Sequence, residues 1–390
     1  MRNDRSIYRT YEKSRRKNSG RLTGKKIAGR IALSFFTVIL LLVFSVYLLG
    51  YVVAHGPSES VRNMLVLSAK QASATKWIPS LFLDEETINK IVEDSEKVTV
   101  DVMSAADYAK QHEENAERKK AAQGERDEWE GSYDGVQLLT DSGDTFKAYV
   151  MLIKDPSRVF VGISSEDYKN ATVGMNIYDL TAKYDAYAAI NGGEFADPGG
   201  AGSGAQPIGL TYSRGECVWN QAANRTFIGF DRNDRLIVTE GMSADQATAL
   251  GIRDCVMFQN GNTLISTYDG NVNLYYASGN TGTAQRTAIG QREDGTVIFI
   301  VTDGRAASSL GATHNDMIDM MVKYGAVTAA MLDGGSSAMM YCENYYNLYD
   351  EFKGATLDEY QERGLVNKYK AFTSPRTIPT YFVVSKGVGN

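Results

Sequence analysis

Residues 329–341 read A-A-M-L-D-G-G-S-S-A-M-M-Y, and this stretch organises the interpretation of the whole chain. A short apolar run stops abruptly at Asp333 and continues into two glycines and two serines. This change predicts a buried strand that ends in a tight turn, because glycine lacks a Cβ and lets backbone approach a ligand closely. We therefore expect chemistry at the end of this strand.

A second copy of this arrangement lies upstream, where residues 297–301 read V-I-F-I-V and lead through Thr302 to Asp303 and Gly304. Two strand ends that each carry an aspartate predict one shared pocket. Between them, residues 314–324 have the apolar spacing of a helix, and Thr313 with Asp316 predicts its N-terminal capping box. The alternative is that each Asp-Gly pair is a plain turn, since this dipeptide is common in turns.

A third apolar run, residues 186–190, ends at Asn191, Gly192 and Gly193, with Glu194 next. This pattern predicts another strand that ends in a glycine turn, and a hairpin without function is the alternative. The glycine-rich residues 197–204 that follow predict either a mobile loop over the site or a surface loop with no role.

The chain from Gly135 onward consists of short apolar or alternating runs separated by Gly, Asn and Asp, with few helical patterns. Within this part of the chain, clear helical spacing is confined to residues 177–184, 243–250 and 314–324. Strands and helices do not alternate regularly until the end of the chain. We therefore predict an α+β domain over residues 131–390, with a strand-rich mixed sheet flanked by helices.

The N-terminal 30 residues are strongly basic, with 11 Lys and Arg against two acidic residues. Residues 31–54 then form an uncharged apolar run, long enough to cross a bilayer of about 30 Å as a helix. A cleaved signal peptide is the weaker alternative, because the run is long and no clear cleavage site follows it. The positive-inside rule predicts a single-pass protein of the cell membrane, with residues 1–30 cytoplasmic and the main domain extracellular.

The charge of the remaining chain argues against nucleic acid as a partner. Subtracting the basic tail from the whole-chain totals of 41 and 47 leaves 30 Lys and Arg against 45 Asp and Glu, a net charge of about −15. Such an acidic surface repels phosphate backbones. Between the apolar run and the main domain, residues 55–130 have helical spacing followed by a charge-rich stretch, which predicts a solvated helical stalk or spacer.

The three cysteines, Cys217, Cys255 and Cys342, lack the spacing of metal ligands. One internal disulfide at most is expected, with Cys217–Cys255 the preferred pair and a buried free thiol the alternative. We predict no cofactor and no metal site, although the number of acidic residues is compatible with a divalent cation.

The order of five short motifs resembles the phosphodiester glycosidase family over roughly residues 135–384. The motifs are Asn191-Gly-Gly-Glu-Phe195, Arg286-Thr-Ala-Ile-Gly-Gln291, Asp303-Gly-Arg305, Leu332-Asp-Gly-Gly-Ser-Ser337 and Pro375-Arg376. The chain departs from the family pattern by placing Glu194 where an aromatic residue is usual, Ser336 in place of a third glycine, and Ala338 in place of a serine. The resemblance implies hydrolysis of sugar-1-phosphodiester linkages in phosphorylated glycans, here in polysaccharides of a bacterial cell envelope or secreted polysaccharides.

This reaction places positive charge on the sugar ring and releases a phosphate monoester, which is already a good leaving group. It requires a carboxylate as base or nucleophile, for which Asp303, Asp333 and Glu194 are the candidates. Cations that hold the phosphate are expected at Arg286, Arg305 and Arg376. The other expected substrate-binding residues are Asn191, Gly192, Gly193, His314, Gly334, Gly335, Ser336 and Ser337.

A protein that binds phosphorylated glycans without cleaving them, or serves as a scaffold in envelope polysaccharide synthesis, is the alternative function. Convergence of Asp303, Asp333 and the arginines on one open cleft favours the enzyme. Dispersed side chains favour the binding module.

Overall fold

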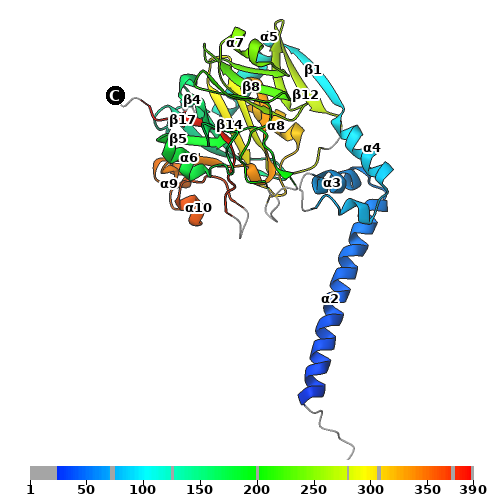
Figure 1. The fold of residues 1–390 in the computed structure, drawn as a ribbon. Coiled ribbons are helices and arrows are strands. Elements are labelled where there is room, and N and C mark those ends of the chain that lie inside the picture. Colours follow the sequence, from blue (N-terminus) through cyan, green and yellow to red (C-terminus); the bar gives the residue numbers. More distant parts are fainter. Residues whose placement is uncertain are drawn as a thin grey trace, which may run out of the picture. The chain divides into compact units, whose positions relative to one another are not determined.

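The computed structural model describes residues 24–70, 75–123, 127–198, 202–278, 281–304, 309–369 and 374–387. The chain forms two compact units that meet between Ser58 and Glu59. Within the second unit, three β-sheets carry most of the structure and helices cover their outer faces (Figure 1).

The first unit contains α2 (Gly24–His55), in which the large apolar side chains are exposed. This helix is long and apolar enough to cross a membrane, judged by its length and composition. The predicted apolar helix is therefore confirmed, although it begins before residue 31 and includes Lys25, Lys26 and Arg30. Most of the predicted basic tail, residues 1–23, lies outside the described residues.

The largest sheet of the second unit has eight strands, each antiparallel to its neighbours. Their spatial order is β1 (Val98–Ser104), β12 (Asn271–Ala277), β11 (Thr263–Tyr268), β15 (Ala326–Leu332), β13 (Thr287–Arg292), β14 (Val297–Thr302), β3 (Lys147–Ile153) and β2 (Val136–Ser142).

Two smaller antiparallel sheets pack with it. The five-stranded sheet has the order β7 (Glu216–Asn220), β6 (Leu210–Ser213), β10 (Ile252–Phe258), β8 (Thr226–Asp231) and β9 (Leu236–Glu240). The four-stranded sheet has the order β16 (Met340–Cys342), β5 (Ala186–Asn191), β17 (Thr380–Ser385) and β4 (Val159–Ile163).

The predicted α+β class is confirmed, but the ladders between the described strands are antiparallel rather than mixed. For five of these ladders the reason is a short connection, which joins β2 to β3, β6 to β7, β8 to β9, β11 to β12 and β13 to β14. Between β13 and β14, for example, Gly295 has a φ of 91° and closes a tight hairpin that only antiparallel strands accommodate.

The main core joins side chains from all three sheets. Every residue of β14 is buried, as its continuous apolar pattern predicts. Each fully buried Val, Ile or Phe contributes about 1.5–3 kcal/mol relative to an exposed position. A rigid centre of this kind fixes the positions of the strand ends from which the candidate site is built.

Helices cover the outer faces of the sheets. Helix α8 (His314–Lys323) starts with the predicted capping box, in which Thr313 Oγ1 accepts from Asp316 N at 3.1 Å, and Thr313 N donates to the Asp316 carboxylate at 2.7 Å. The predicted helices near residues 177 and 243 are present as α6 (Ile177–Lys183) and α7 (Ala244–Leu250). Two short helices, α9 (Tyr345–Leu348) and α10 (Glu359–Glu362), follow later in the chain.

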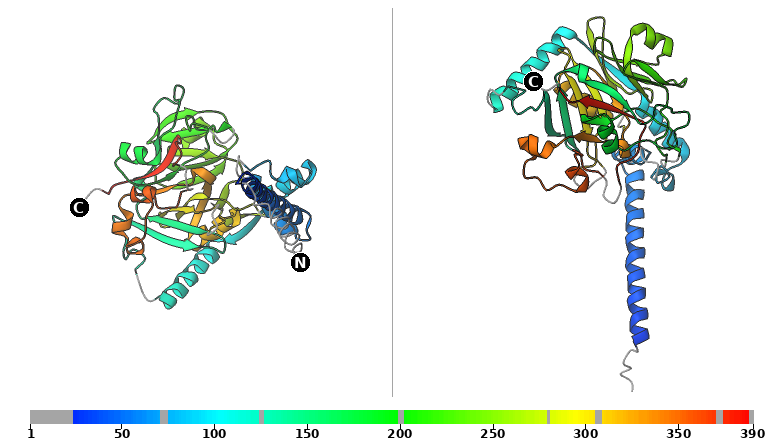
Figure 2. Two further views of the ribbon diagram at one scale, coloured as in Figure 1. Left: turned by 90° about the horizontal axis from the view of Figure 1, so that it is seen from below. Right: turned by 60° about the vertical axis from the view of Figure 1, so that its left-hand side comes forward.

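Within the predicted stalk, residues 55–130, the described residues from Glu59 onward instead belong to the second unit together with the sheets. They include α3 (Glu59–Lys70), η1 (Pro79–Leu81), α4 (Glu85–Glu96), β1 and α5 (Ala105–Gln123). Strand β1 pairs with β12 along its whole length, and Tyr108 of α5 donates a 2.6 Å hydrogen bond to Ala326 O. In Figure 2, β1 and α5 form one cyan segment along this body. The high charge of residues 105–130 hid these contacts, which depend on a few apolar residues.

The predicted Cys217–Cys255 disulfide is wrong. Tyr212 of β6 pairs with Cys255 of β10 on one side and Cys217 of β7 on the other, so one strand separates the cysteines. Strands lie about 4.8 Å apart, which puts the two Cα atoms about 10 Å apart, beyond the reach of a disulfide. All three cysteines are free, and the alternative of a buried thiol is correct for Cys255 and Cys342.

A chain shortened to begin at Glu130 is expected to be less stable than one beginning at Glu59, because it loses β1 and the Tyr108 hydrogen bond. We expect the melting temperature to fall by at least about 5 °C, or roughly 2 kcal/mol. Thermal unfolding followed by circular dichroism measures the difference. Equal melting temperatures would restore the spacer interpretation.

Candidate active site

The two Asp-Gly turns leave the eight-stranded sheet at the same edge. Strand β13 lies between β14 and β15, and Thr287 pairs with both Val301 and Leu332. Gln285 then joins the two turns, because its Nε2 donates to Gly304 O at 3.1 Å and its backbone oxygen accepts from Gly335 N at 2.9 Å. The sequence-based expectation that these strand ends are neighbours is correct.

The two carboxylates nevertheless belong to opposite faces of the sheet. Cross-strand partners share a face and successive residues alternate, so Asp303 lies on the face of Thr287 and Val301, whereas Asp333 follows Leu332 onto the other face. Continuing the register by one residue sets Arg286 opposite Asp333, on the same face. One aspartate and one arginine, rather than two aspartates, are therefore cross-strand neighbours.

Asp303 is enclosed by the protein, with 7% of its surface exposed. Its carboxylate accepts from the Tyr149 hydroxyl and from Lys368 N, both at 3.0 Å. Burial raises the pKa of Asp303, against the opposing effect of these hydrogen bonds and of the Lys368 charge. These contacts tie residues 367–369 to the end of β14.

Asn191 joins the ends of three strands from two sheets. This fully buried residue ends β5; its Nδ2 donates to Asp333 O at 2.6 Å. Its Oδ1 accepts from Thr287 Oγ1 at 2.7 Å and from Met339 N at 3.1 Å. The amide therefore sets the position of the Asp333 backbone relative to β13.

Gly192 and Gly193 are required by close backbone packing. A Cβ would lie 2.5 Å from Thr380 Oγ1 at Gly192 and 2.3 Å from Met257 O at Gly193. Their N–H groups donate to Thr380 O at 2.9 Å and Thr380 Oγ1 at 3.3 Å, respectively. Gly192 O accepts from Asp333 N at 3.2 Å, so the turn of Gly192 and Gly193 is hydrogen-bonded directly to the Asp333 turn.

Asp333 is partly exposed at the start of the turn that contains η4 (Gly335–Ser337). Desolvation raises its pKa to about 6, against the opposing effects of a Ser337 hydrogen bond and the Arg376 charge. The Gly334 N–H donates to the Asp333 carboxylate at 3.0 Å. Gly335 N and Ser337 N donate to Gln285 O and Gly334 O, so three backbone amides of the expected substrate-binding residues 334–337 have partners within the protein.

Arg376 is the cation whose charge acts on Asp333. Its guanidinium binds Asp197 through two hydrogen bonds of 2.9 and 2.8 Å and reaches Ser336 Oγ at 3.2 Å. It also lies over the Phe195 ring, 5.0 Å from the centroid. Although burial acts to raise the pKa of Asp197, the bonds to Arg376 hold it below its usual value.

Tyr369 links the turn at Ser336 to the backbone at Arg376. Its hydroxyl donates to Ser336 O and accepts from Arg376 N at 3.3 Å. Asp333, Ser336, Ser337, Arg376, Asp197 and Tyr369 therefore make one polar cluster, which we call the Asp333 cluster. Asp197 and Tyr369 were missed in the sequence, because no local pattern predicts which partner a loop carboxylate or a distant tyrosine will meet.

Arg286 and His314 lie on the side of this edge facing α8 and β12. Arg286 Nε donates to Ala312 O, and its Nη2 donates to Gly282 O, both at 3.1 Å. His314 is buried, with Nε2 3.1 Å from Tyr275 O. Burial, with a smaller effect of the Arg286 charge, lowers the pKa of His314 to about 4, so the imidazole is neutral at pH 7. Arg305 lies outside the described residues.

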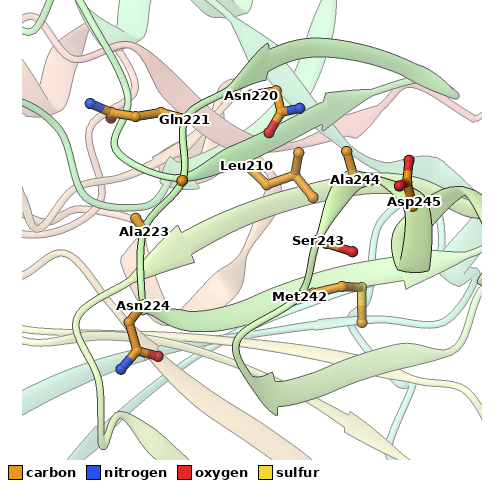
Figure 3. A pocket seen from close by; sticks show the side chains of 10 residues that line it. Leu210, Asn220, Gln221, Ala223, Asn224, Met242, Ser243, Ala244 and Asp245 are labelled. Atoms are coloured by element: carbon orange, nitrogen blue, oxygen red, sulfur yellow. The ribbon is translucent and has the colours of Figure 1, made fainter.

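Glu194 forms an ion pair rather than pointing alone into the site. Arg225 Nε donates to its carboxylate at 2.5 Å. The same guanidinium donates to Asn224 O at 3.0 Å, on the rim of an open groove of about 680 Å³ (Figure 3). This groove does not include the Asp333 cluster. Its lining combines apolar, small, amide and acidic residues: Leu210, Asn220, Gln221, Ala222, Ala223, Asn224, Met242, Ser243, Ala244 and Asp245.

The Asp333 cluster offers two carboxylates, of which Asp333 has the raised pKa, together with one arginine and three hydroxyl groups. Among the described residues, no group of three or more His, Cys, Asp or Glu side chains is placed to hold a metal ion. The cluster therefore suits proton transfer beside a bound anion.

Comparison with known proteins adds three findings. The family model described as phosphodiester glycosidase matches residues 184–385. The catalytic domain of zebrafish N-acetylglucosamine-1-phosphodiester alpha-N-acetylglucosaminidase, auto-inhibited by its pro-peptide, is 15% identical with a TM-score of 0.48, covering 74% of this chain and 88% of that one. A protein from Burkholderia pseudomallei described as exported is 14% identical with a TM-score of 0.41, over 76% and 88% of the two chains.

A curated relative matches over a short region. The SPbeta prophage-derived uncharacterized protein YomE of Bacillus subtilis is 41% identical over 75 residues, which are 19% of this chain and 12% of that protein. The chain therefore matches about one eighth of the length of this relative.

Replacing Asn191 with alanine is expected to destabilise the fold, because it leaves the Thr287 hydroxyl, Met339 N and Asp333 O without their buried partner. We expect a loss of about 2–4 kcal/mol in the free energy of unfolding. Urea unfolding measures it, and Asn220→Ala on the exposed groove rim is the matched control, expected within about 0.5 kcal/mol of the parent. A similarly small effect at Asn191 would contradict its role.

Proposed function

The chain belongs to the phosphodiester glycosidase family, and from this premise we propose that it hydrolyses the bond between an anomeric carbon and phosphate in a sugar-1-phosphodiester. The observation that carries the proposal is the partly exposed Asp333 carboxylate, whose raised pKa and neighbouring Arg376 suit a base beside an anionic substrate. Phosphorylated glycans of the cell envelope or of secreted polysaccharides are the proposed substrate class.

In the proposed reaction, Asp333 removes a proton from a water molecule as the water oxygen bonds to the anomeric carbon. The bond from that carbon to the phosphate oxygen breaks, and its electron pair leaves with the phosphate. The products are a free sugar and a phosphate monoester, and the proton on Asp333 returns to solvent. A good leaving group makes strong acid catalysis unnecessary, in contrast to ordinary glycoside hydrolysis with two carboxylates.

Arg376 and Ser336 are the proposed phosphate contacts. Arg376 is already held by Asp197, so its guanidinium is oriented before substrate arrives. Arg286 is the proposed second cation, since the ladder register sets it beside Asp333. Asp303 and Glu194 are proposed to position the site, because each carboxylate is already held by protein donors.

The binding module remains the second candidate. Three side chains expected to contact substrate, Asp303, Glu194 and Arg286, have protein partners. This dispersal favours recognition without cleavage. A wild-type protein that binds sugar-1-phosphodiesters and never turns them over would establish this second function.

The proposed location is the outer face of the cell membrane. Lys25, Lys26 and Arg30 precede the apolar part of α2, and basic residues on that side support a cytoplasmic N-terminus. A cleaved signal peptide is the competing interpretation of the same helix.

Replacing Asp333 with asparagine is expected to lower turnover of a sugar-1-phosphodiester at least about 100-fold, roughly 3 kcal/mol of transition-state stabilisation. The melting temperature should not fall, since asparagine keeps an acceptor for Gly334 N and removes a charge that desolvation disfavours. The assay uses methyl diesters of glucose-1-phosphate and N-acetylglucosamine-1-phosphate.

Asp303→Asn is the matched control, the same change at the other Asp-Gly turn. It should lower the melting temperature by disturbing the Tyr149 and Lys368 hydrogen bonds, while turnover of the folded enzyme falls by about tenfold at most, as expected of a residue that positions the site without acting as the base. Near-normal turnover in the Asp333 variant would make Asp333 a turn residue only.

The pH dependence of kcat/KM should follow the ionisation of Asp333. Its pKa is raised to about 6, and a base must be ionised, so activity falls about tenfold per pH unit below pH 6 and is level above about pH 7. A pH–rate profile of the wild-type protein on the methyl diesters measures this. Activity that is constant from pH 5 to 7, or that falls as pH rises, would contradict the assignment.

A further inference from the structure

We propose that the natural substrate is a phosphodiester whose alcohol part is embedded in a lipid bilayer, and that the turn carrying Trp77 and Leu81 binds the bilayer surface beside the Asp333 cluster. This inference rests on the proposed function and adds the chemical class of the leaving alcohol. It comes from the helical segment that connects α2 to the sheets.

The described residues of this segment, 59–70 and 75–96, belong to the second unit. Helices α3 and α4 pack through their own small core of Val66, Leu67, Ile88 and Ile91 (Figure 1). Asp84 caps α4 by accepting from Thr87 N at 2.7 Å. The segment can therefore present its surface side chains in a defined place.

Helix α3 packs against the loop that holds Arg286. A Cβ on Gly282 would lie 2.7 Å from the Leu67 backbone, and Thr283 N donates to Ser68 Oγ at 3.1 Å. The oxygen of the same Gly282 accepts from Arg286 Nη2 at 3.1 Å. The charge of Lys76 also acts on Asp197, the partner of Arg376. The described residues 59–70 and 75–96 thus form a wall beside the candidate site.

That wall exposes large apolar side chains. Trp77 is 60% exposed and Leu81 is 50% exposed. Ser80 N donates to Trp77 O at 3.2 Å and Leu81 N to Ile78 O at 3.1 Å, so the backbone here turns helically. Residues four apart on such a turn lie on the same side. Tryptophan favours membrane interfaces, where its ring meets lipid and its N–H meets water.

A short link joins this segment to the apolar helix α2. Only residues 56–58 separate His55, the end of α2, from Glu59, the start of α3. Such a link spans at most about 14 Å, so when α2 crosses the bilayer, α3 begins near the bilayer surface. Continuity with the apolar helix identifies lipid, rather than a protein, as the proposed partner of Trp77 and Leu81.

A lipid-linked phosphodiester matches this arrangement. Its hydrocarbon chain stays in the bilayer while its sugar and phosphate lie at the surface. There they lie beside the wall that packs on the Gly282 loop, which contacts Arg286, and that also neighbours Asp197. A small soluble diester can reach the Asp333 cluster without the bilayer. Contact of Trp77 and Leu81 with lipid should therefore matter for the first kind of substrate alone.

The test uses the full-length protein in phosphatidylcholine vesicles and two forms of the same substrate. Methyl and hexadecyl diesters of glucose-1-phosphate and N-acetylglucosamine-1-phosphate are compared, the hexadecyl form being incorporated in the vesicles. The variant carries Trp77→Ser and Leu81→Ser. The matched control is Tyr268→Ser, an aromatic residue that is 78% exposed on the hairpin between β11 and β12.

We expect the double variant to lose at least tenfold in turnover of the hexadecyl diester and to stay within twofold on the methyl diester, with no change in the control. If the double variant turns over the hexadecyl diester at the wild-type rate, the inference is overturned. An equal loss on both would also overturn it, because the wall would then act by supporting the site.

Lipid contact is also measured without catalysis. Vesicles of brominated phosphatidylcholine should quench the fluorescence of Trp77, one of three tryptophans in the chain, and the quenching should be smaller in the double variant. Undiminished quenching in that variant contradicts lipid contact, as does a change in its oligomeric state, which would identify a second copy as the partner. A wild-type protein that is quenched but cleaves no methyl diester refutes the proposed function and leaves the lipid contact standing.

Discussion

The buried amide of Asn191 is the interaction on which the candidate site depends. It is the point where the end of β5, from the four-stranded sheet, meets the ends of β13 and β15, from the eight-stranded sheet. Neither sheet alone determines where the Asp333 turn lies. Because the amide donates and accepts hydrogen bonds within the protein, it fixes the geometry of the site.

Desolvation destabilises the ionised form of Asp333, and a residue that only forms a turn does not need this charge. The desolvation outweighs the opposing effects of the Ser337 hydrogen bond, the Arg376 charge and the Gly334 hydrogen bond. Asp197 meanwhile holds Arg376 and adds a second negative charge to the cluster. An anionic substrate therefore has to share Arg376 with Asp197. Such a poised arrangement is typical of functional sites, where groups with perturbed pKa values concentrate.

Local patterns in the sequence predicted the elements well. The capping box of α8, the buried strand β14 and the common edge of the two Asp-Gly turns follow from spacing alone. The face of the sheet on which each aspartate lies could not be predicted. Asp303 and Asp333 lie on opposite faces because of the register of the ladders, which local spacing does not reveal. The pairing of β1 with β12 joins residues about 170 positions apart, and although residues 98–102 alternate between apolar and polar, that alternation does not identify the partner strand. Partners of Arg376 and Glu194 likewise come from loops whose contacts only the fold determines.

The central claim is that water attacks the anomeric carbon and that the bond from this carbon to phosphate oxygen breaks. Hydrolysis of a sugar-1-phosphate methyl diester in water enriched in oxygen-18 tests it directly, with mass spectrometry of both products. The account predicts the heavy oxygen in the sugar and none in methyl phosphate. Label in the phosphate product would show attack at phosphorus and contradict the account, as would the absence of any turnover.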